Sequence, residues 1–179
     1  MIVGGALVPF YAEMRQTSDI DLVIQLSLTG KTKNMLIEQL VANQFTPFTT
    51  WNDTFLEWPR QSFVTFLDAR SMIKIDMNLL KNVEQSTNKY MQIGILAMKR
   101  RVQIDYLGIL CWAQSKEDFI LAKLVYEGYQ DYRDALACWI RYEEEMDVDY
   151  LRNTCKMLSI NDLLDAIMEK KPVEDVFPD

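Results

Sequence analysis

The pattern of hydrophobic and polar positions predicts a mixed α/β arrangement in the first half of the chain. Residues 20–26 are dense in β-branched and aliphatic side chains, and residues 72–79 alternate between apolar and polar positions, so both segments are predicted strands. Residues 32–43 repeat apolar side chains at helical spacing, which predicts an amphipathic helix. The other elements expected here are strands at 1–3, 45–51 and 62–67 and a short helix over 6–14 that begins near Pro9.

The pattern becomes mainly helical in the second half of the chain. Residues 88–101 predict a helix that ends in a basic triplet, and residues 102–113 predict two short strands around Gly108. Ser115, followed three residues later by Asp118, resembles the capping box that opens a helix. Further helices are expected at 132–144, 149–158 and 160–169, with a frayed tail after them.

Together these elements indicate an α/β (α+β) fold, in which a mixed β-sheet is flanked by helices and followed by a C-terminal helical bundle. The expected organisation is an α/β core over residues 1–114, a helical subdomain over 115–170 and a flexible tail over 171–179.

Composition and charge narrow the range of functions. The formal net charge of −7 argues against nonspecific nucleic-acid binding, because the phosphate backbone attracts basic surfaces. The sequence contains no histidine, which excludes Ser-His-Asp and Cys-His catalysis and most zinc sites. Three widely spaced cysteines without a CxxC pair indicate reduced thiols. Neither a membrane span nor a signal peptide is predicted, so we expect a cytoplasmic location.

Two aspartates, Asp19 and Asp21, open the predicted strand at 20–26. Residues two apart in a strand point to the same face, so the two carboxylates project together and repel one another unless a cation lies between them. A hard divalent ion such as Mg²⁺ resolves this conflict, because it binds carboxylate oxygens and keeps positions for phosphate and water. The alternative is that this common spacing lies in a solvent-exposed loop.

The surroundings of the aspartate pair favour a phosphate-binding site. Gly4 and Gly5 allow backbone N–H groups to approach a ligand closely, and Arg15 and Thr17 supply a cation and a hydroxyl. A third carboxylate, Asp76, interrupts the apolar strand at 72–79, where a charge is unfavourable without a metal or a donor. Its alternative interpretation is a water-facing aspartate on an edge strand.

Two of these segments match a known family. Val-Gly-Gly-Ala at 3–6 and Arg-x-Thr-x-Asp-Ile-Asp at 15–21 resemble the signature of the DNA polymerase beta-like nucleotidyltransferase superfamily, and most closely bacterial AbiEii-type toxins and related nucleotidyltransferase-like proteins. The resemblance implies that the glycine pair holds the phosphates of a nucleotide and that three carboxylates bind Mg²⁺. By that resemblance these roles fall on Gly4, Gly5, Asp19, Asp21 and Asp76.

A second segment extends the resemblance. Residues 115–124, Ser-Lys-Glu-Asp-Phe-Ile-Leu-Ala-Lys-Leu, are similar to a segment that this group places beside its active site. The resemblance implies a catalytic role for Lys123 and makes Asp134 its acidic companion. Both residues have a simpler alternative as solvated residues on a helix surface. The chain departs from the family in having no helix before the glycine pair and no recognisable tRNA-binding domain.

The sequence therefore predicts a Mg²⁺-dependent enzyme that moves a nucleoside monophosphate from a nucleoside triphosphate to an acceptor hydroxyl. The acceptor stays open between a tRNA end, a protein hydroxyl and a small molecule. A toxin restrained by a cognate antitoxin is a further hypothesis. The competing one is a catalytically inactive protein of the same fold that binds a nucleotide or a partner protein.

Overall fold

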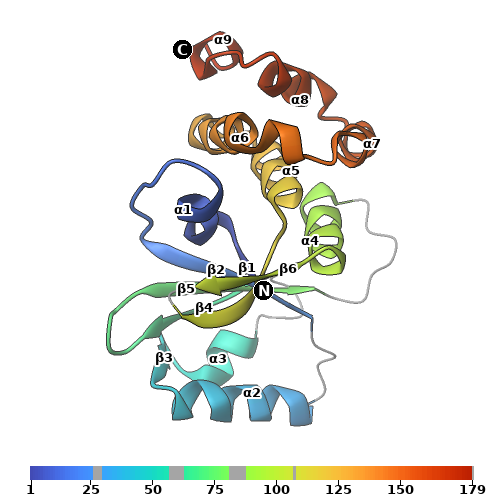
Figure 1. Cartoon of the computed structure of the whole chain (residues 1–179). Coiled ribbons are helices and arrows are strands. Elements are labelled where there is room, and N and C mark those ends of the chain that lie inside the picture. Colours follow the sequence, from blue (N-terminus) through green and yellow to red (C-terminus); the bar gives the residue numbers. More distant parts are fainter. Residues whose placement is uncertain (26–29, 57–62, 81–87, 107, 179) are drawn as a thin grey trace. The chain divides into compact units, whose positions relative to one another are not determined.

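The computed structural model describes residues 1–25, 30–56, 63–80, 88–106 and 108–178 (Figure 1). Within these residues the chain is mixed α/β, as the sequence predicts. The chain divides into two compact units: the first comprises residues 1–6 and 16–85, and the second comprises residues 7–15 and 86–179. The boundary that the sequence places after residue 114 thus lies inside the second unit.

The first unit is built on a mixed sheet with the strand order β3-β4-β5-β2-β1. Strands β2 and β5 are parallel, whereas the other neighbouring pairs in this unit are antiparallel. The strands are β1 (Ile2–Val3), β2 (Asp19–Gln25), β3 (Phe45–Pro47), β4 (Phe63–Asp68) and β5 (Lys74–Leu80).

Helices α2 (Gly30–Ala42) and α3 (Trp51–Leu56) cover one face of this sheet (Figure 1). The apolar positions of β2, which are Ile20, Leu22 and Ile24, pack into the core on that side. Because side chains alternate along a strand, Asp19 and Asp21 project from the opposite face. The buried residues of this core are Leu40, Phe55, Val64, Phe66, Ile75, Met77 and Leu79.

The second unit is mainly helical, with one antiparallel hairpin. Strands β6 (Val102–Tyr106) and β7 (Ile109–Ala113) turn at Gly108, whose φ of +82° is easily reached only by glycine. The helices are α1 (Val8–Tyr11), α4 (Lys89–Lys99), α5 (Lys116–Tyr126), α6 (Tyr129–Tyr142), α7 (Val148–Leu158), α8 (Asn161–Met168) and α9 (Val173–Val176).

Local side-chain bonds explain where several of these helices begin. Ser115 accepts a hydrogen bond from the backbone N–H of Asp118 and Asp147 accepts one from Tyr150, which caps α5 and α7. The expected start at Ser115 is therefore confirmed. Within this unit, Tyr142 on α6 donates to the carbonyl of Phe10, so the short segment 7–15 is held against a helix far along the chain.

Some element predictions differ from the structure. The strand expected over 45–51 ends at Pro47, because Thr50 accepts a hydrogen bond from the N–H of Asp53 and thereby starts α3. The tail expected to fray forms α9, where Val173 is buried. The helix expected over 6–14 is a short α-helix, α1, preceded by a 3-10 helix over Gly4–Leu7. The predicted strand ends at Leu26 and Ser62 and the last residue, Asp179, lie outside the described residues.

Among the helices of the described residues, none combines the length and apolar character needed to cross a bilayer.

Candidate functional site

The three predicted metal-binding carboxylates come together in the first unit. In the parallel pairing of β2 with β5, Asp21 lies directly opposite Asp76, and Asp19 lies opposite Lys74. Paired residues of neighbouring strands point to the same face, so all four side chains project from the sheet face opposite α2 and α3. The structure thus brings the DxD pair and the third aspartate together, as the sequence pattern expects.

Lys74 supplies the positive charge between these carboxylates. Its Nζ lies 2.8 Å from Oδ2 of Asp76 and 3.1 Å from Oδ2 of Asp19. The hydrogen bonds to Asp76 and Asp19 raise the pKa of Lys74 to about 12. The sequence interpretation missed this residue, although the spacing of Lys74 and Asp76 is the same i, i+2 spacing that places Asp19 beside Asp21.

The environment of Asp21 is unfavourable for carrying a charge. Burial raises its pKa, and the neighbouring charges of Asp19 and Asp76 raise it further. A backbone hydrogen bond from Gly5 and the charge of Lys74 only partly oppose this effect. An additional cation near Asp21 would therefore be strongly favoured by the charges already present.

Two hydroxyl groups hold the other carboxylates in place. Thr65 on β4 donates to Oδ1 of Asp76 at 2.6 Å, and Thr17 donates to Oδ1 of Asp19 at 3.2 Å. Thr17 was predicted to contact a ligand, whereas in the structure it orients a neighbouring carboxylate. Thr65 was not anticipated, since only the pairing of β4 with β5 places it opposite Asp76.

Gly4 allows the close approach of the first strand to Asp21. Its φ is +66°, and a Cβ added at this position would lie 2.5 Å from Oδ2 of Asp21. A side chain here would both strain the backbone and displace the carboxylate. The close approach to Asp21 therefore explains the glycine at position 4, while Gly5 donates a backbone hydrogen bond to the same aspartate.

Lys123 and Asp134 form a separate cluster in the second unit. Nζ of Lys123 lies 2.6 Å from Oδ1 of Asp131 and 2.9 Å from Oδ2 of Asp134. Lys123 is 7% exposed and Asp134 is 3% exposed, so the alternative that they are solvated surface residues is wrong. Asp131, which the sequence interpretation missed, is the second carboxylate that holds this lysine.

Arg15 belongs to the same cluster. Its Nε and Nη2 donate to the two oxygens of Asp134 at 3.1 and 2.8 Å, which is a bidentate pair. Burial alone raises the pKa of Asp134, but hydrogen bonds from Arg15, Lys123 and Gln130 outweigh burial and hold the pKa below its ordinary value. The cation predicted to bind a nucleotide is therefore bonded to an aspartate within its own unit.

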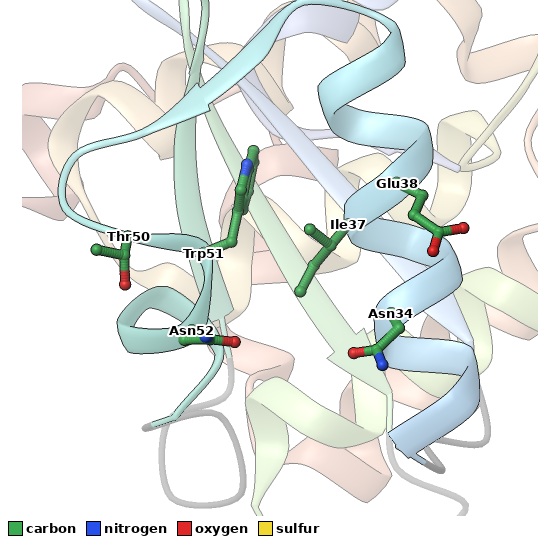
Figure 2. A pocket seen from close by; sticks show the side chains of 6 residues that line it. All are labelled: Asn34, Ile37, Glu38, Thr50, Trp51 and Asn52. Atoms are coloured by element: carbon green, nitrogen blue, oxygen red, sulfur yellow. The ribbon is translucent and has the colours of Figure 1, made fainter.

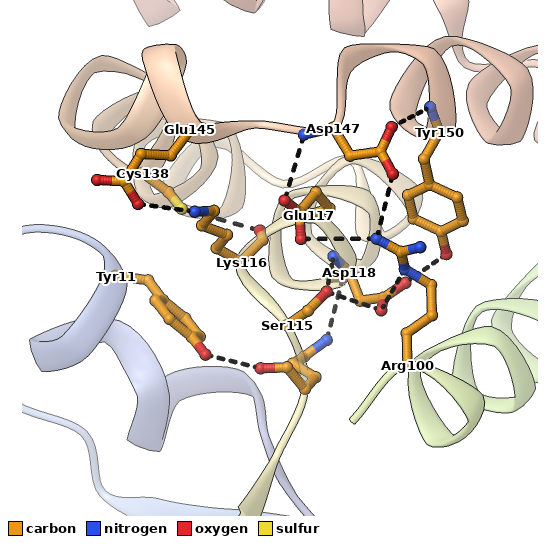
Figure 3. A network of polar contacts seen from close by, with 11 residues as sticks. Tyr11, Arg100, Ser115, Lys116, Glu117, Asp118, Cys138, Glu145, Asp147 and Tyr150 are labelled. Carbon is orange, nitrogen blue, oxygen red and sulfur yellow. Dashed lines mark hydrogen bonds and ion pairs between the residues drawn. The ribbon is translucent and has the colours of Figure 1, made fainter. Parts of the chain in front are cut away.

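A second buried polar network joins α4, α5 and α7 in the same unit (Figure 3). Asp118 is fully buried, and it accepts hydrogen bonds from the hydroxyls of Tyr150 at 2.6 Å and Ser115 at 2.9 Å. Burial nevertheless raises its pKa. The guanidinium of Arg100 lies 3.7 Å from the ring centre of Tyr150 and 3.6 Å from Oδ2 of Asp147. This network connects helix ends around a fully buried carboxylate, so we assign it a structural role.

A shallow pocket of about 330 Å³ opens on the helical side of the first unit (Figure 2). Trp51 on its wall also packs against Phe55 and Phe66, with ring centres 6.2 and 5.8 Å away. The pocket is therefore the outer edge of the hydrophobic core, on the sheet face opposite the carboxylates. Its lining residues are Asn34, Ile37, Glu38, Thr50, Trp51 and Asn52.

The carboxylate cluster supplies oxygen donors, the ligand type that hard divalent ions bind. In the part of the chain that the structure describes, no group of three or more His, Cys, Asp or Glu side chains is arranged as a metal site. Lys74 lies between Asp19 and Asp76, and Asp21 accepts a hydrogen bond from the backbone of Gly5. Two carboxylates already surround a cationic group there, and carboxylate oxygens are the ligands that Mg²⁺ prefers.

A scan against protein-family models and a search of curated proteins both find no match for this chain. The resemblance to nucleotidyltransferases thus stays a prediction that depends on residues 3–6, 15–21 and 115–124.

Proposed function

We propose that the protein is a Mg²⁺-dependent nucleotidyltransferase, which moves a nucleoside monophosphate from a nucleoside triphosphate to the hydroxyl of an acceptor. The observation that supports this proposal most is the pairing of Asp21 with Asp76, beside Asp19, on one face of the sheet. Three carboxylates on one sheet face carry more negative charge than Lys74 alone balances, and they suit the binding of a metal and a triphosphate.

Asp76 is the residue that we assign to proton transfer. The acceptor oxygen forms a bond to the α-phosphorus, the bond between that phosphorus and the bridging oxygen breaks, and pyrophosphate leaves with the electron pair. The hydroxyl proton passes to the carboxylate of Asp76, which Thr65 holds in a fixed orientation at 2.6 Å. Mg²⁺ bound to Asp19, Asp21 and Asp76 would supply neutralisation of the phosphate charge.

The acceptor is one of three classes, a tRNA end, a protein hydroxyl or a small molecule. Growth arrest on expression, relieved by a neighbouring gene product, would support the hypothesis of a toxin with a cognate antitoxin.

Transfer of label from α-³²P nucleoside triphosphates tests the proposal. Purified protein with Mg²⁺ and each acceptor class should give a labelled product, and Asp19→Ala and Asp21→Ala should both abolish it. Asp68→Ala is the matched control, because Asp68 is a carboxylate of the same sheet that bonds to Arg70 and Ser71 instead of joining the cluster. Full transfer by Asp21→Ala protein with an unchanged circular dichroism spectrum would refute the assignment.

The inactive alternative is favoured by one observation, which is that Lys74 already balances part of the carboxylate charge without a metal. Calorimetry with a nucleoside triphosphate and Mg²⁺ distinguishes the two hypotheses when it is combined with the labelling assay. Binding without transfer to any acceptor class would favour the inactive protein, and binding with transfer would favour the enzyme.

A further inference from the structure

We propose that Lys74 is an internal competitor of the divalent cation, so that the metal enters the carboxylate cluster only when the ammonium group leaves it. This inference rests on the proposed function, because it concerns the regulation of the same site. It assigns to Lys74 a role that the resemblance to nucleotidyltransferases does not supply.

The geometry of the cluster makes the two cations mutually exclusive. The ammonium of Lys74 lies within hydrogen-bond distance of one oxygen each of Asp19 and Asp76. Those carboxylates are two of the three that would bind the metal, and both use Oδ2 for the lysine. The site is partly buried, so its effective dielectric constant is lower than that of water and two cations a few ångströms apart repel strongly there. The incoming ion must therefore displace the ammonium.

The side chain of Lys74 is suited to leaving. It is 39% exposed, and a lysine presents a hydrated point charge on a flexible four-carbon stem, unlike the planar fork of an arginine. Asp76 keeps its bond to Thr65 and Asp19 keeps its bond to Thr17 when the ammonium departs, so both carboxylates stay oriented. The metal would thus replace the ammonium as the counter-ion while Asp19 and Asp76 keep their orientations.

The occupancy of the cluster by Lys74 has two consequences. While Lys74 lies in the cluster, the carboxylates repel one another less and the metal-free protein is stabilised. The apparent metal affinity is reduced by the fraction of molecules in which the lysine occupies the cluster, as for any binding-competent state that is only partly populated. Lys74 therefore determines the metal concentration at which the metal occupies the carboxylate cluster.

Direct measurement of Mn²⁺ binding to the full chain, without nucleotide, tests this inference. We expect Lys74→Gln to bind Mn²⁺ about tenfold more tightly than the wild-type protein in calorimetry and in electron paramagnetic resonance titrations, which is within the usual range for coupled ligands. Lys74→Arg keeps the charge and should bind no more tightly than the wild type. Lys33→Gln removes one charge from α2, on the opposite sheet face, and should leave the affinity unchanged.

Thermal unfolding gives a second readout that does not depend on activity. In chelator, Lys74→Gln should unfold at a lower temperature than the wild type, and saturating Mn²⁺ should raise its unfolding temperature by more than it raises that of the wild type. Equal or weaker Mn²⁺ binding by Lys74→Gln would overturn the competition, whereas labelled transfer by the wild type would still support the proposed function. Absence of Mn²⁺ binding in both proteins would overturn the competition and the metal-dependent mechanism together.

Discussion

Asp21 and Asp76 lie directly opposite one another on the parallel strands β2 and β5. Each carboxylate raises the electrostatic free energy of the other, and the raised pKa of Asp21 reflects burial together with the charges of Asp19 and Asp76. Functional sites retain unfavourable charge pairs of this kind because the charges bind a ligand. The folded protein is less stable as a result. The folded state should therefore gain stability when one charge is removed.

Asp21→Asn tests this gain. The substitution removes the repulsion but preserves the shape of the side chain, so in chelator at pH 7 we expect the free energy of unfolding to rise by about 1 kcal/mol and the unfolding temperature by about 2–4 °C. Differential scanning calorimetry measures both. Asp68→Asn is the control: hydrogen bonds with Ser71 and the N–H of Arg70 lower the pKa of Asp68, so this variant should show no increase. A decrease in stability for Asp21→Asn would contradict the repulsion.

A comparison of Gly4→Ala with Gly108→Ala separates the effect of backbone strain from the effect on the carboxylate cluster. Both glycines have positive φ, so each substitution should destabilise the protein by about 1–2 kcal/mol. The new Cβ at Gly4 also meets Oδ2 of Asp21, whereas the one at Gly108 meets nothing within 4 Å. Only Gly4→Ala should therefore weaken Mn²⁺ binding. Equal Mn²⁺ affinities in the two variants would show that Asp21 does not depend on this close approach.

Asp134→Asn should strongly destabilise the second unit. The substitution leaves Lys123 with one carboxylate and Arg15 without its bidentate partner, and breaking a buried ion pair from one side costs about 3 kcal/mol. Chemical denaturation at pH 7 measures the loss. Asp131→Asn is the matched control, because Asp131 is more exposed and Lys123 keeps Asp134, so its loss should be about 1 kcal/mol or less.

Asp134 also predicts a pH dependence of the stability. Its pKa in the folded state lies below the ordinary value of 3.8, so the ionised carboxylate stabilises the fold above about pH 4. This contribution is lost as the pH falls below about 4 and passes through the lowered pKa. The wild type should lose more stability than Asp134→Asn between pH 5 and pH 2, as measured by denaturant midpoints. Parallel pH profiles for the two proteins would contradict the ion-pair assignment.

Tyr150→Phe tests the buried network around Asp118. Loss of the hydroxyl leaves one oxygen of a fully buried carboxylate without its 2.6 Å donor, so we expect a loss of about 2 kcal/mol. Tyr129→Phe removes a hydroxyl that donates to Glu174 at an exposed position, and its effect should stay within about 0.5 kcal/mol. Thermal unfolding of both variants gives the comparison, and equal effects would show that burial does not govern the strength of these bonds.

Much of the local structure could be predicted from the sequence, because helices and strands follow short-range periodicity. The density of β-branched and aliphatic side chains over residues 20–26 predicted β2, and Ser115 predicted the start of α5. The predicted strand over residues 45–51 was too long, because Thr50 caps α3 and the chain becomes helical there. The prediction also failed for the tail, which forms α9 with Val173 buried. Both errors concern contacts or caps that the hydrophobic pattern does not encode.

The candidate site was only partly predictable for the same reason. That Asp19 and Asp21 share a face follows from strand geometry alone. Lys74 and Thr65 were missed because their importance depends on which strands pair with β2 and β5, and in what register. Asp131 was missed because its partner Lys123 lies on a different helix, across the turn between α5 and α6.

The sequence by itself determined the alternation of the strands, the shared face of the two aspartates and the absence of histidine chemistry, since each depends only on residue identity and local spacing. The tertiary structure alone decided that Asp21 lies opposite Asp76, that Lys74 bridges two carboxylates and that Arg15 bonds to Asp134, 119 residues away. Strand register and helix packing are fixed by the burial of apolar faces from distant segments, so no local pattern contains them.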